Sequence, residues 1–166
     1  MDACDVWELA RHGAELKGEL SLEDLPRLAE QLAESRGALR FRFRGRIDER
    51  GRPAARLELD GTVTARCDRC GGPVEVTLRE EALFFFVADE AELGALPIDD
   101  SPDEPLLGSH RFDLLGLVED QAILALPISP RHEGCVAPEV GDRGRSQAPE
   151  TQRPFGVLAG LKKRGN

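Results

Sequence analysis

The sequence predicts an α+β domain in which a few helices pack on a curved antiparallel β-sheet. Two stretches of alternating apolar and polar residues, 38–47 and 57–65, predict neighbouring strands joined by the turn "DERGRP". A third strand is expected from residue 74 onward, and a helix with one apolar side is expected at 113–126. Because the strands follow one another with no helix between them, the pattern excludes a doubly wound parallel sheet.

The residues before this sheet predict two helices and one strand. A short helix is expected around 6–10 and a strand near 14–20. For the second helix, Asp24 can act as the N-cap, Pro26 is tolerated in the first turn, and Gly37 ends the helix. Its apolar side is expected to consist of Leu25, Leu28, Ala29 and Leu32.

Alternation assigns one side of each strand to the core. In the third strand the alternation changes phase near Glu80, which predicts a β-bulge. The residues expected on the buried side are Leu39, Phe41, Phe43 and Ile47 in the first strand, Leu57, Leu59, Val63 and Ala65 in the second, and Val74, Val76 and Leu78 in the third.

Two stretches hold too much charge, proline and glycine to pack well. Residues 88–110 predict a mobile acidic loop, and residues 136–153 predict a disordered linker. The helix between these stretches is expected to be capped by Asp113 and ended by Pro127.

Length and composition predict a single cytoplasmic domain. With 166 residues the chain can bury a core, and we expect a domain at 1–135 followed by a flexible segment at 136–166. No apolar run approaches the ~20 residues that a membrane helix needs, so no membrane partner is expected. The start "MDACDVWELARHGAE" does not resemble a secretory signal, and in the cytoplasm thiols stay reduced.

Charge is segregated along the chain, although the net charge of −9 alone argues against nucleic-acid binding. Residues 36–56 hold eight arginines against two acidic residues, a local balance of +6, so the rest of the chain sums to −15. Residues 80–110 hold nine acidic residues and no lysine or arginine. The basic segment is therefore a candidate surface for RNA phosphates, and the acidic one is a candidate surface for a basic partner.

Cys67 and Cys70 form a Cys-x-x-Cys pair in the turn between the second and third strands. Two more ligands are available in "PRHEGC", where His132 and Cys135 follow the last helix, and two separate pairs of this kind commonly complete a zinc site. Free surface thiols remain an alternative. A redox dithiol is a weaker alternative, because the sequence after Cys70 does not predict a helix, and a helix N-terminus is what would lower the thiol pKa.

A row of arginines alternates with apolar residues along 38–47, so the guanidinium groups project from one side of the strand. Guanidinium groups bind phosphates and stack on bases. The alternative is that these arginines form ion pairs across the sheet with Glu58 and Asp60. The candidate RNA-binding residues are Arg40, Arg42, Arg44, Arg46, Arg66 and Arg69.

With these motifs in view, the chain resembles the YceD family of bacterial large-ribosomal-RNA-subunit accumulation proteins. The resemblance is strongest at 63–74, at 112–135, which includes "DLLGLVEDQAILALPISPRHEGC", and at 154–163, "PFGVLAGLKK". It implies a cytoplasmic, non-enzymatic factor needed for normal accumulation or processing of large-subunit ribosomal RNA. Matched by position, the family's cysteine pair falls on Cys67 and Cys70, and its later His/Cys element falls on His132 and Cys135.

Two functions are therefore weighed. The first is an RNA-associated factor in ribosome assembly, which would contact large-subunit ribosomal RNA or its precursor. The second is a protein–protein adaptor that docks a ribosomal or assembly protein through the acidic loop or the terminal segment. An enzyme is the weakest hypothesis, because no phosphate loop, nucleophile elbow or paired-carboxylate motif is present. The oligomeric state is left open.

Overall fold

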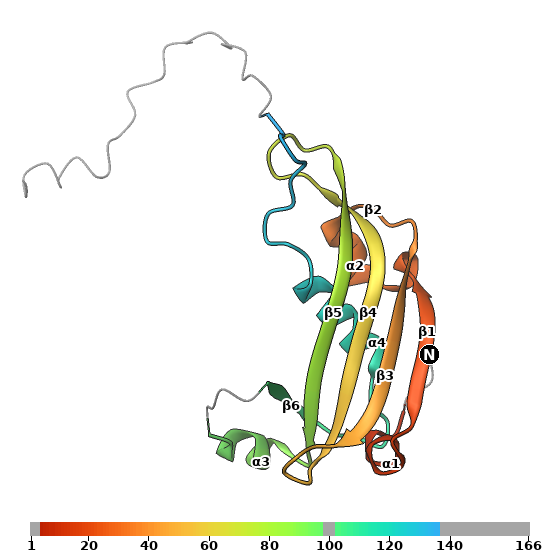
Figure 1. The fold of residues 1–166 in the computed structure, drawn as a ribbon, viewed down its shortest axis with the longest axis vertical. Coiled ribbons are helices and arrows are strands. Elements are labelled where there is room, and N and C mark those ends of the chain that lie inside the picture. Colours follow the sequence, from red (N-terminus) through yellow and green to blue (C-terminus); the bar gives the residue numbers. More distant parts are fainter. Residues whose placement is uncertain (1–3, 98–101, 137–166) are drawn as a thin grey trace, which may run out of the picture. The chain divides into compact units, whose positions relative to one another are not determined.

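The computed structural model describes residues 4–97 and 102–136. Within these residues, four α-helices and a mixed six-stranded sheet confirm the α+β class (Figure 1). The strand order is β1-β3-β4-β5-β6, and β2 pairs with β4. The elements are α1 (Val6–His12), β1 (Glu15–Ser21), the 3-10 turn η1 (Leu22–Asp24), α2 (Pro26–Gln31), β2 (Leu32–Glu34), β3 (Ala38–Ile47), β4 (Pro53–Arg66), β5 (Pro73–Val87), α3 (Glu90–Ala95), β6 (Asp103–Leu107) and α4 (Leu114–Leu124).

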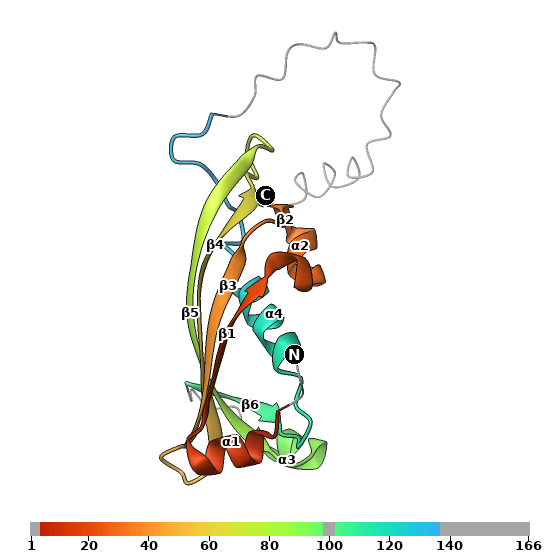
Figure 2. The same cartoon turned by 90° about the vertical axis from the view of Figure 1, so that its right-hand side faces the viewer.

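The predicted antiparallel arrangement holds for every pairing except that of β6. β1, β3, β4 and β5 pair in antiparallel fashion, whereas β6 lies parallel to the end of β5. Figure 2 shows that the long strands bend and that α2 and α4 lie on the same side of the sheet. The predicted curved sheet with packed helices is therefore confirmed. The side of the sheet that packs on α1, α2 and α4 is called the inner face below, and the opposite side is called the outer face.

The main core lies between the inner face and the helices. The alternating residues Leu39, Phe41 and Phe43 are buried, and they join Val6 and Leu9 of α1 in one apolar cluster. Leu57, Leu59, Val63 and Ala65 of β4 are buried as predicted, and α2 and α4 contribute Leu28, Leu114 and Val118. In β5, Leu78 is buried, whereas Val74 and Val76 are half-buried. Ile47, at the end of β3, is 51% exposed, so its predicted burial is wrong.

The predicted bulge near Glu80 is absent. β4 pairs with β5 in one unbroken register from Ala54 opposite Phe85 to Arg66 opposite Pro73. The run Phe84–Val87 is buried because both sides of β5 are covered there. Phe84 and Phe86 enter the main core, while Phe85 and Val87 pack with Leu93 and Leu96 in a second, smaller cluster. Burial on two sides explains the change of apolar pattern without a change of register.

The acidic stretch is more ordered than the sequence predicts. It contains α3, capped by the Asp89 side chain, and β6, which adds a strand to the sheet. The expectation of a mobile loop is therefore wrong at 90–95 and 103–107. Residues 98–101 and the predicted flexible segment from 137 onward lie outside the described residues.

The second helix is shorter than predicted, and its N-terminus is capped from another helix. α2 ends at Gln31, and Asp24 belongs to the preceding 3-10 turn. The carboxylate of Glu119 in α4, only 5% exposed, accepts hydrogen bonds from the backbone N–H groups of Arg27 (2.7 Å) and Leu28 (3.2 Å). The Arg27 guanidinium donates to Glu119 at 2.7 Å and to Asp120 at 2.6 Å. One buried carboxylate thus joins α2 to α4.

Replacing this carboxylate should loosen the helix pair. Burial raises the pKa of Glu119, but the hydrogen bonds from Arg27 and Leu28 lower it by more, so the pKa lies below its ordinary value. The ionised group therefore stabilises the fold above the unfolded-state pKa of about 4.3, and this contribution is lost as the pH falls through the folded-state pKa. We expect Glu119→Gln to lower the free energy of unfolding by about 2 kcal/mol at pH 7.

Urea denaturation at pH 7 and at progressively lower pH checks this expectation. The difference between the parent and Glu119→Gln should shrink in acid, and Asp120→Asn, which alters an exposed ion pair, should cost about 0.5 kcal/mol or less. Equal effects of the two substitutions at pH 7 would contradict the capping role.

Candidate metal centre and arginine face

The turn between β4 and β5 presents two cysteine sulfurs from a tightly bonded loop. The Cys67 N–H donates to the Gly72 carbonyl at 2.8 Å, and the Gly71 N–H donates to the Cys67 carbonyl at 2.8 Å. Gly71 has φ +75°, in the left-handed region that glycine adopts without strain. Cys67 is buried at the base of the turn, and Cys70 is exposed.

The segment after α4 brings the second pair of side chains to this turn. The Asp68 N–H donates to the Pro130 carbonyl at 2.9 Å, and the Arg69 guanidinium donates to the Cys135 carbonyl. A second tight turn, with Gly134 at φ +68°, lets the Cys135 N–H donate to the His132 carbonyl at 3.2 Å. Arg69 therefore acts here in positioning the loop.

The structure brings all four sequence-predicted metal ligands together. One sulfur or nitrogen atom from each of Cys67, Cys70, His132 and Cys135 lies within 4.8 Å of all the others. The Cys67 and Cys135 Sγ atoms are 3.7 Å apart, and Cys70 Sγ lies 3.6 Å from His132 Nδ1. A tetrahedral zinc ion, with Zn–S of about 2.3 Å and Zn–N of about 2.0–2.1 Å, requires separations of about 3.8 and 3.6 Å. The donor set and its spacing thus fit a tetrahedral metal ion.

The histidine ring is held in the tautomer that such an ion needs. His132 Nε2 lies 2.7 Å from the Pro73 carbonyl oxygen, which can only accept a hydrogen bond, so Nε2 carries the proton. The unprotonated Nδ1 then faces the three sulfurs. Hydrogen bonds of this outer kind fix the orientation of histidine ligands in metal sites. The Gly72 N–H also points at Cys70 Sγ, at 3.5 Å.

The local electrostatics favour one thiolate before any metal binds. The Cys70 backbone N–H lowers the pKa of Cys67 most, against the opposing effect of desolvation, to about 6. Burial, followed by the neighbouring sulfurs of Cys70 and Cys67, raises the pKa of Cys135 to about 11. The Pro73 carbonyl raises the pKa of His132. A divalent cation would stabilise the thiolates together, since metal ligands bind deprotonated.

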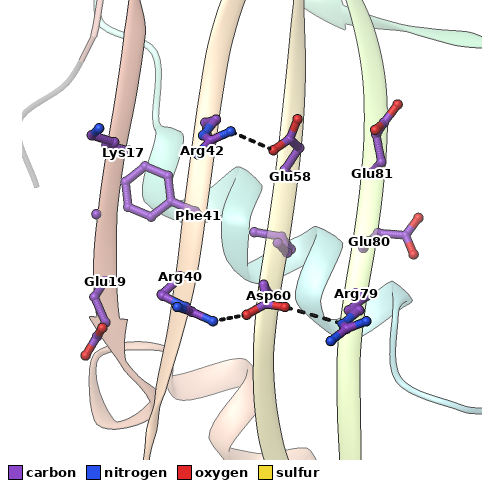
Figure 3. A pocket seen from close by; sticks show the side chains of 12 residues that line it. Lys17, Glu19, Arg40, Phe41, Arg42, Glu58, Asp60, Arg79, Glu80 and Glu81 are labelled. Carbon is purple, nitrogen blue, oxygen red and sulfur yellow. Dashed lines mark hydrogen bonds and ion pairs between the residues drawn. The ribbon is translucent and has the colours of Figure 1, made fainter.

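The arginine row lies on the outer face, within a lattice of opposite charges (Figure 3). Arg40 is ion-paired with Asp60, which also pairs with Arg79 at 3.5 Å. Arg42 lies 3.5 Å from Glu58 and 3.9 Å from Glu15. The expected alternative of cross-strand pairing with Glu58 and Asp60 is therefore confirmed for two arginines, and sequence reasoning missed Glu15 and Arg79.

The other candidate RNA-binding residues differ in accessibility. Arg44 is exposed and forms no ion pair with a described residue. In the sheet it stands opposite Arg56 of β4 and opposite Glu15 of β1, and Arg56 itself lies 3.5 Å from Glu81. Arg46 has a side chain only 29% exposed and pairs with the nearly buried Asp103, so it is the least accessible of the row. Arg66 is exposed at the end of β4, beside the cysteine turn.

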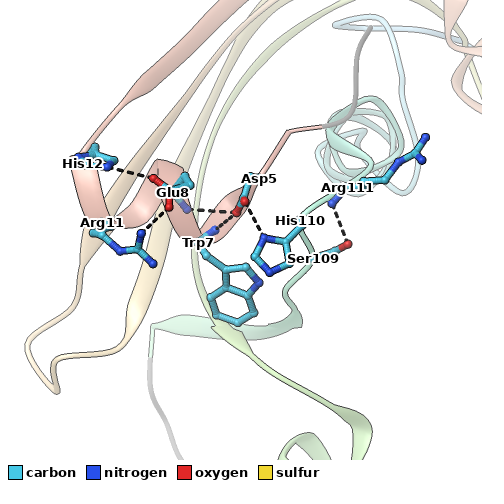
Figure 4. A network of polar contacts seen from close by, with 8 residues as sticks. All are labelled: Asp5, Trp7, Glu8, Arg11, His12, Ser109, His110 and Arg111. Carbon is cyan, nitrogen blue, oxygen red and sulfur yellow. Dashed lines mark hydrogen bonds and ion pairs between the residues drawn. The ribbon is translucent and has the colours of Figure 1, made fainter.

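A third polar network, which the sequence did not indicate, stabilises the start of the domain (Figure 4). Asp5 caps α1 by accepting from the N–H groups of Trp7 and Glu8, and its second oxygen lies 2.6 Å from His110 Nδ1. Glu8 contacts Arg11 and His12 one turn later. These contacts tie the first helix to the segment before α4, and their role is structural.

Comparison with known proteins identifies relatives of this chain. Among residues 4–97 and 102–136, no helix has the length and apolarity needed to cross a membrane. No solved structure matches the chain. A Haemophilus influenzae protein, large ribosomal RNA subunit accumulation protein YceD, is 29% identical over 155 residues, covering 89% of this chain and 87% of the relative. The family model of large ribosomal RNA subunit accumulation protein YceD matches residues 55–162, from β4 through the loop that holds His132 and Cys135 and beyond, and the chain belongs to this family.

Proposed function

We propose that this protein is a non-enzymatic cytoplasmic factor that supports the accumulation of large-subunit (23S) ribosomal RNA by binding that RNA or its precursor. The family description supports the biological role. The observation that supports RNA contact is the position of Arg44 directly opposite Arg56 on the exposed outer face, where Arg56 lies 3.5 Å from Glu81. Like charges directly opposite each other destabilise a sheet, and a bound phosphate between them would relieve the repulsion.

The ion pairs around this position do not prevent phosphate binding. Arg40 and Arg42 have side chains 69% and 54% exposed, and exposed ion pairs of this kind contribute only about 0–1 kcal/mol. Exchange of a carboxylate partner for a phosphate therefore costs little. Arg66 and Arg69 would extend the RNA-binding surface toward the cysteine turn, whereas Arg46 would serve mainly to hold β6 through Asp103.

A second function, a protein–protein adaptor, is favoured by the charge balance of the same face. Arg40, Arg42 and Arg79 have acidic partners, so much of the basic charge is compensated. Glu90 and Glu92 are exposed on α3, which fixes part of the acidic stretch on the surface. A basic ribosomal or assembly protein is the partner that such a surface would bind.

Substitution at the opposed arginines distinguishes the two functions. We expect Arg44→Glu with Arg56→Glu to weaken binding to a 23S ribosomal RNA transcript at least about tenfold. The slope of log affinity against log salt should flatten by roughly 0.7 for each phosphate interaction removed on single-stranded RNA. The matched control is Arg11→Glu with Arg111→Glu, which makes the same charge change at two exposed positions outside the outer face. Filter binding across salt concentrations measures both variants.

Equal affinity of the parent and the Arg44/Arg56 variant, with both folded, would contradict RNA contact through this face. Equal weakening in the Arg11/Arg111 control would show that only net charge matters. In either case the adaptor function would become the leading hypothesis.

We also propose that Cys67, Cys70, His132 and Cys135 bind one structural zinc ion. The sulfur and nitrogen separations and the fixed histidine tautomer support this proposal. The four residues are supplied by protein alone, with no position left for substrate, which is the arrangement of structural rather than catalytic zinc. The ion would hold the loop after α4 to the β4–β5 turn.

Purified protein should therefore contain about one zinc per chain by mass spectrometry of the native protein. Chelation, or Cys70→Ser, should lower the melting temperature, because the metal closes a loop of about 60 residues between the two ligand pairs. Cys4→Ser is the matched control, since Cys4 lies outside the cluster. Zinc-free protein with four freely reactive thiols, purified without chelator, would contradict the proposal.

A further inference from the structure

β1 forms one edge of the sheet, and no strand in the described part of the chain pairs with the edge of β1 that faces away from β3. Figure 2 shows this strand facing the viewer along its length. Residues Glu15 to Glu19 are all exposed. An edge strand with free backbone groups is a template for pairing with another strand.

The hydrogen-bond pattern identifies which backbone groups face outward. The Gly45 N–H donates to the Ala14 carbonyl and the Leu22 N–H donates to the Gly37 carbonyl, in each case between directly opposite residues. Hydrogen-bonded and non-bonded pairs alternate along an antiparallel ladder. Even-numbered residues of β1 therefore bond to β3, and the backbone groups of Glu15, Lys17 and Glu19 point away from the sheet.

We propose that β1 pairs with β1 of a second copy of this chain, antiparallel and with the two-fold axis at Gly18. In this register Lys17 lies opposite Glu19 of the second copy, and Glu19 lies opposite its Lys17. Both residues direct their backbone groups outward, so each of these pairs can form the two hydrogen bonds of a bonded pair. Two opposite-charge pairs and a continuous ladder then join the two sheets.

Neighbouring registers lack this complementarity. A shift that centres the axis on Lys17 places Lys17 opposite Lys17 and Glu15 opposite Glu19, and a shift to Glu19 places Glu19 opposite itself. Like charges directly opposite each other are destabilising. The charge order of "ELKGELS" therefore selects one register and favours a second copy over an unrelated strand.

The inner face of the same pairing is also complementary. Leu16, which is 38% exposed, would lie opposite the half-buried Leu20 of the second copy. Gly18 would meet Gly18 at a non-bonded position, where the strands approach most closely. Glycine suits β1 here because the Phe41 ring covers this position: a Cβ on Gly18 would lie 3.0 Å from Phe41 Cε1.

Analytical ultracentrifugation over a range of protein concentrations tests the proposal. The pairing is small, so the parent should show a weak dimer that grows with concentration. Lys17→Glu and Glu19→Lys should each weaken the dimer at least about tenfold, because each turns two attractive pairs into two repulsive ones. An equimolar mixture of the two variants should restore dimers, since every Glu would then face a Lys.

The matched controls are Arg66→Glu and Glu75→Lys, which make the same charge changes on the outer face away from β1. They should leave the dimer unchanged. A parent that stays monomeric at every concentration, a dimer that survives both β1 substitutions, or variants whose mixture does not associate would each overturn the proposal. Circular dichroism confirms that each variant is folded before its association is measured.

Discussion

The unbroken pairing of β4 with β3 and β5 is the constraint on which the rest of the structure depends. Nine residues of β4, from Pro53 to Gly61, pair with β3, and thirteen, from Ala54 to Arg66, pair with β5, with no shift of register against either strand. A shift of one residue would move every apolar side chain from the core to solvent. The same register places the charged side chains in rows across the outer face and brings Cys67 to the turn after β4.

The packing of α2 on α4 positions the segment that carries His132 and Cys135. Glu119 fixes α4 against α2 through two backbone N–H groups and the Arg27 guanidinium. Because α4 is held there, the segment that follows it reaches the β4–β5 turn, where Asp68 and Arg69 bond to its carbonyls. The second pair of candidate ligands thus follows a helix that is held in place by the buried carboxylate of Glu119. Separation of the two helices should therefore affect the geometry of the proposed metal site as well as the stability of the fold.

Much of this arrangement was predictable from the sequence, for identifiable physical reasons. Strict alternation at 38–47 and 57–65 predicted β3 and β4, because a strand buried on one side has a period of two. The proximity of Cys67 and Cys70 to His132 and Cys135 was predicted because zinc sites commonly combine short-spaced pairs from separate loops. Where burial had a different cause, prediction failed. The run Phe84–Val87 suggested a bulge, because one side of β5 there faces the main core and the other is covered by Leu93 and Leu96, which lie in a stretch whose composition predicted a loop.

Long-range polar contacts were also beyond sequence reasoning. Nothing local indicates that Glu119 caps α2 or that His110 pairs with Asp5, because each partner lies about a hundred residues away. The ion pairs of the outer face were anticipated for Glu58 and Asp60, whereas the opposition of Arg44 and Arg56 depends on the register that only the structure supplies. The proposed binding of RNA rests on that opposition.

The measurement that tests this central claim most directly is ultraviolet crosslinking of the protein in cells, followed by sequencing of the attached RNA and mass spectrometry of the crosslinked peptides. RNA binding through the outer face predicts large-subunit ribosomal RNA attached to peptides from β3 and β4. Crosslinks found only to proteins, or to RNA through peptides that exclude these two strands, would contradict it.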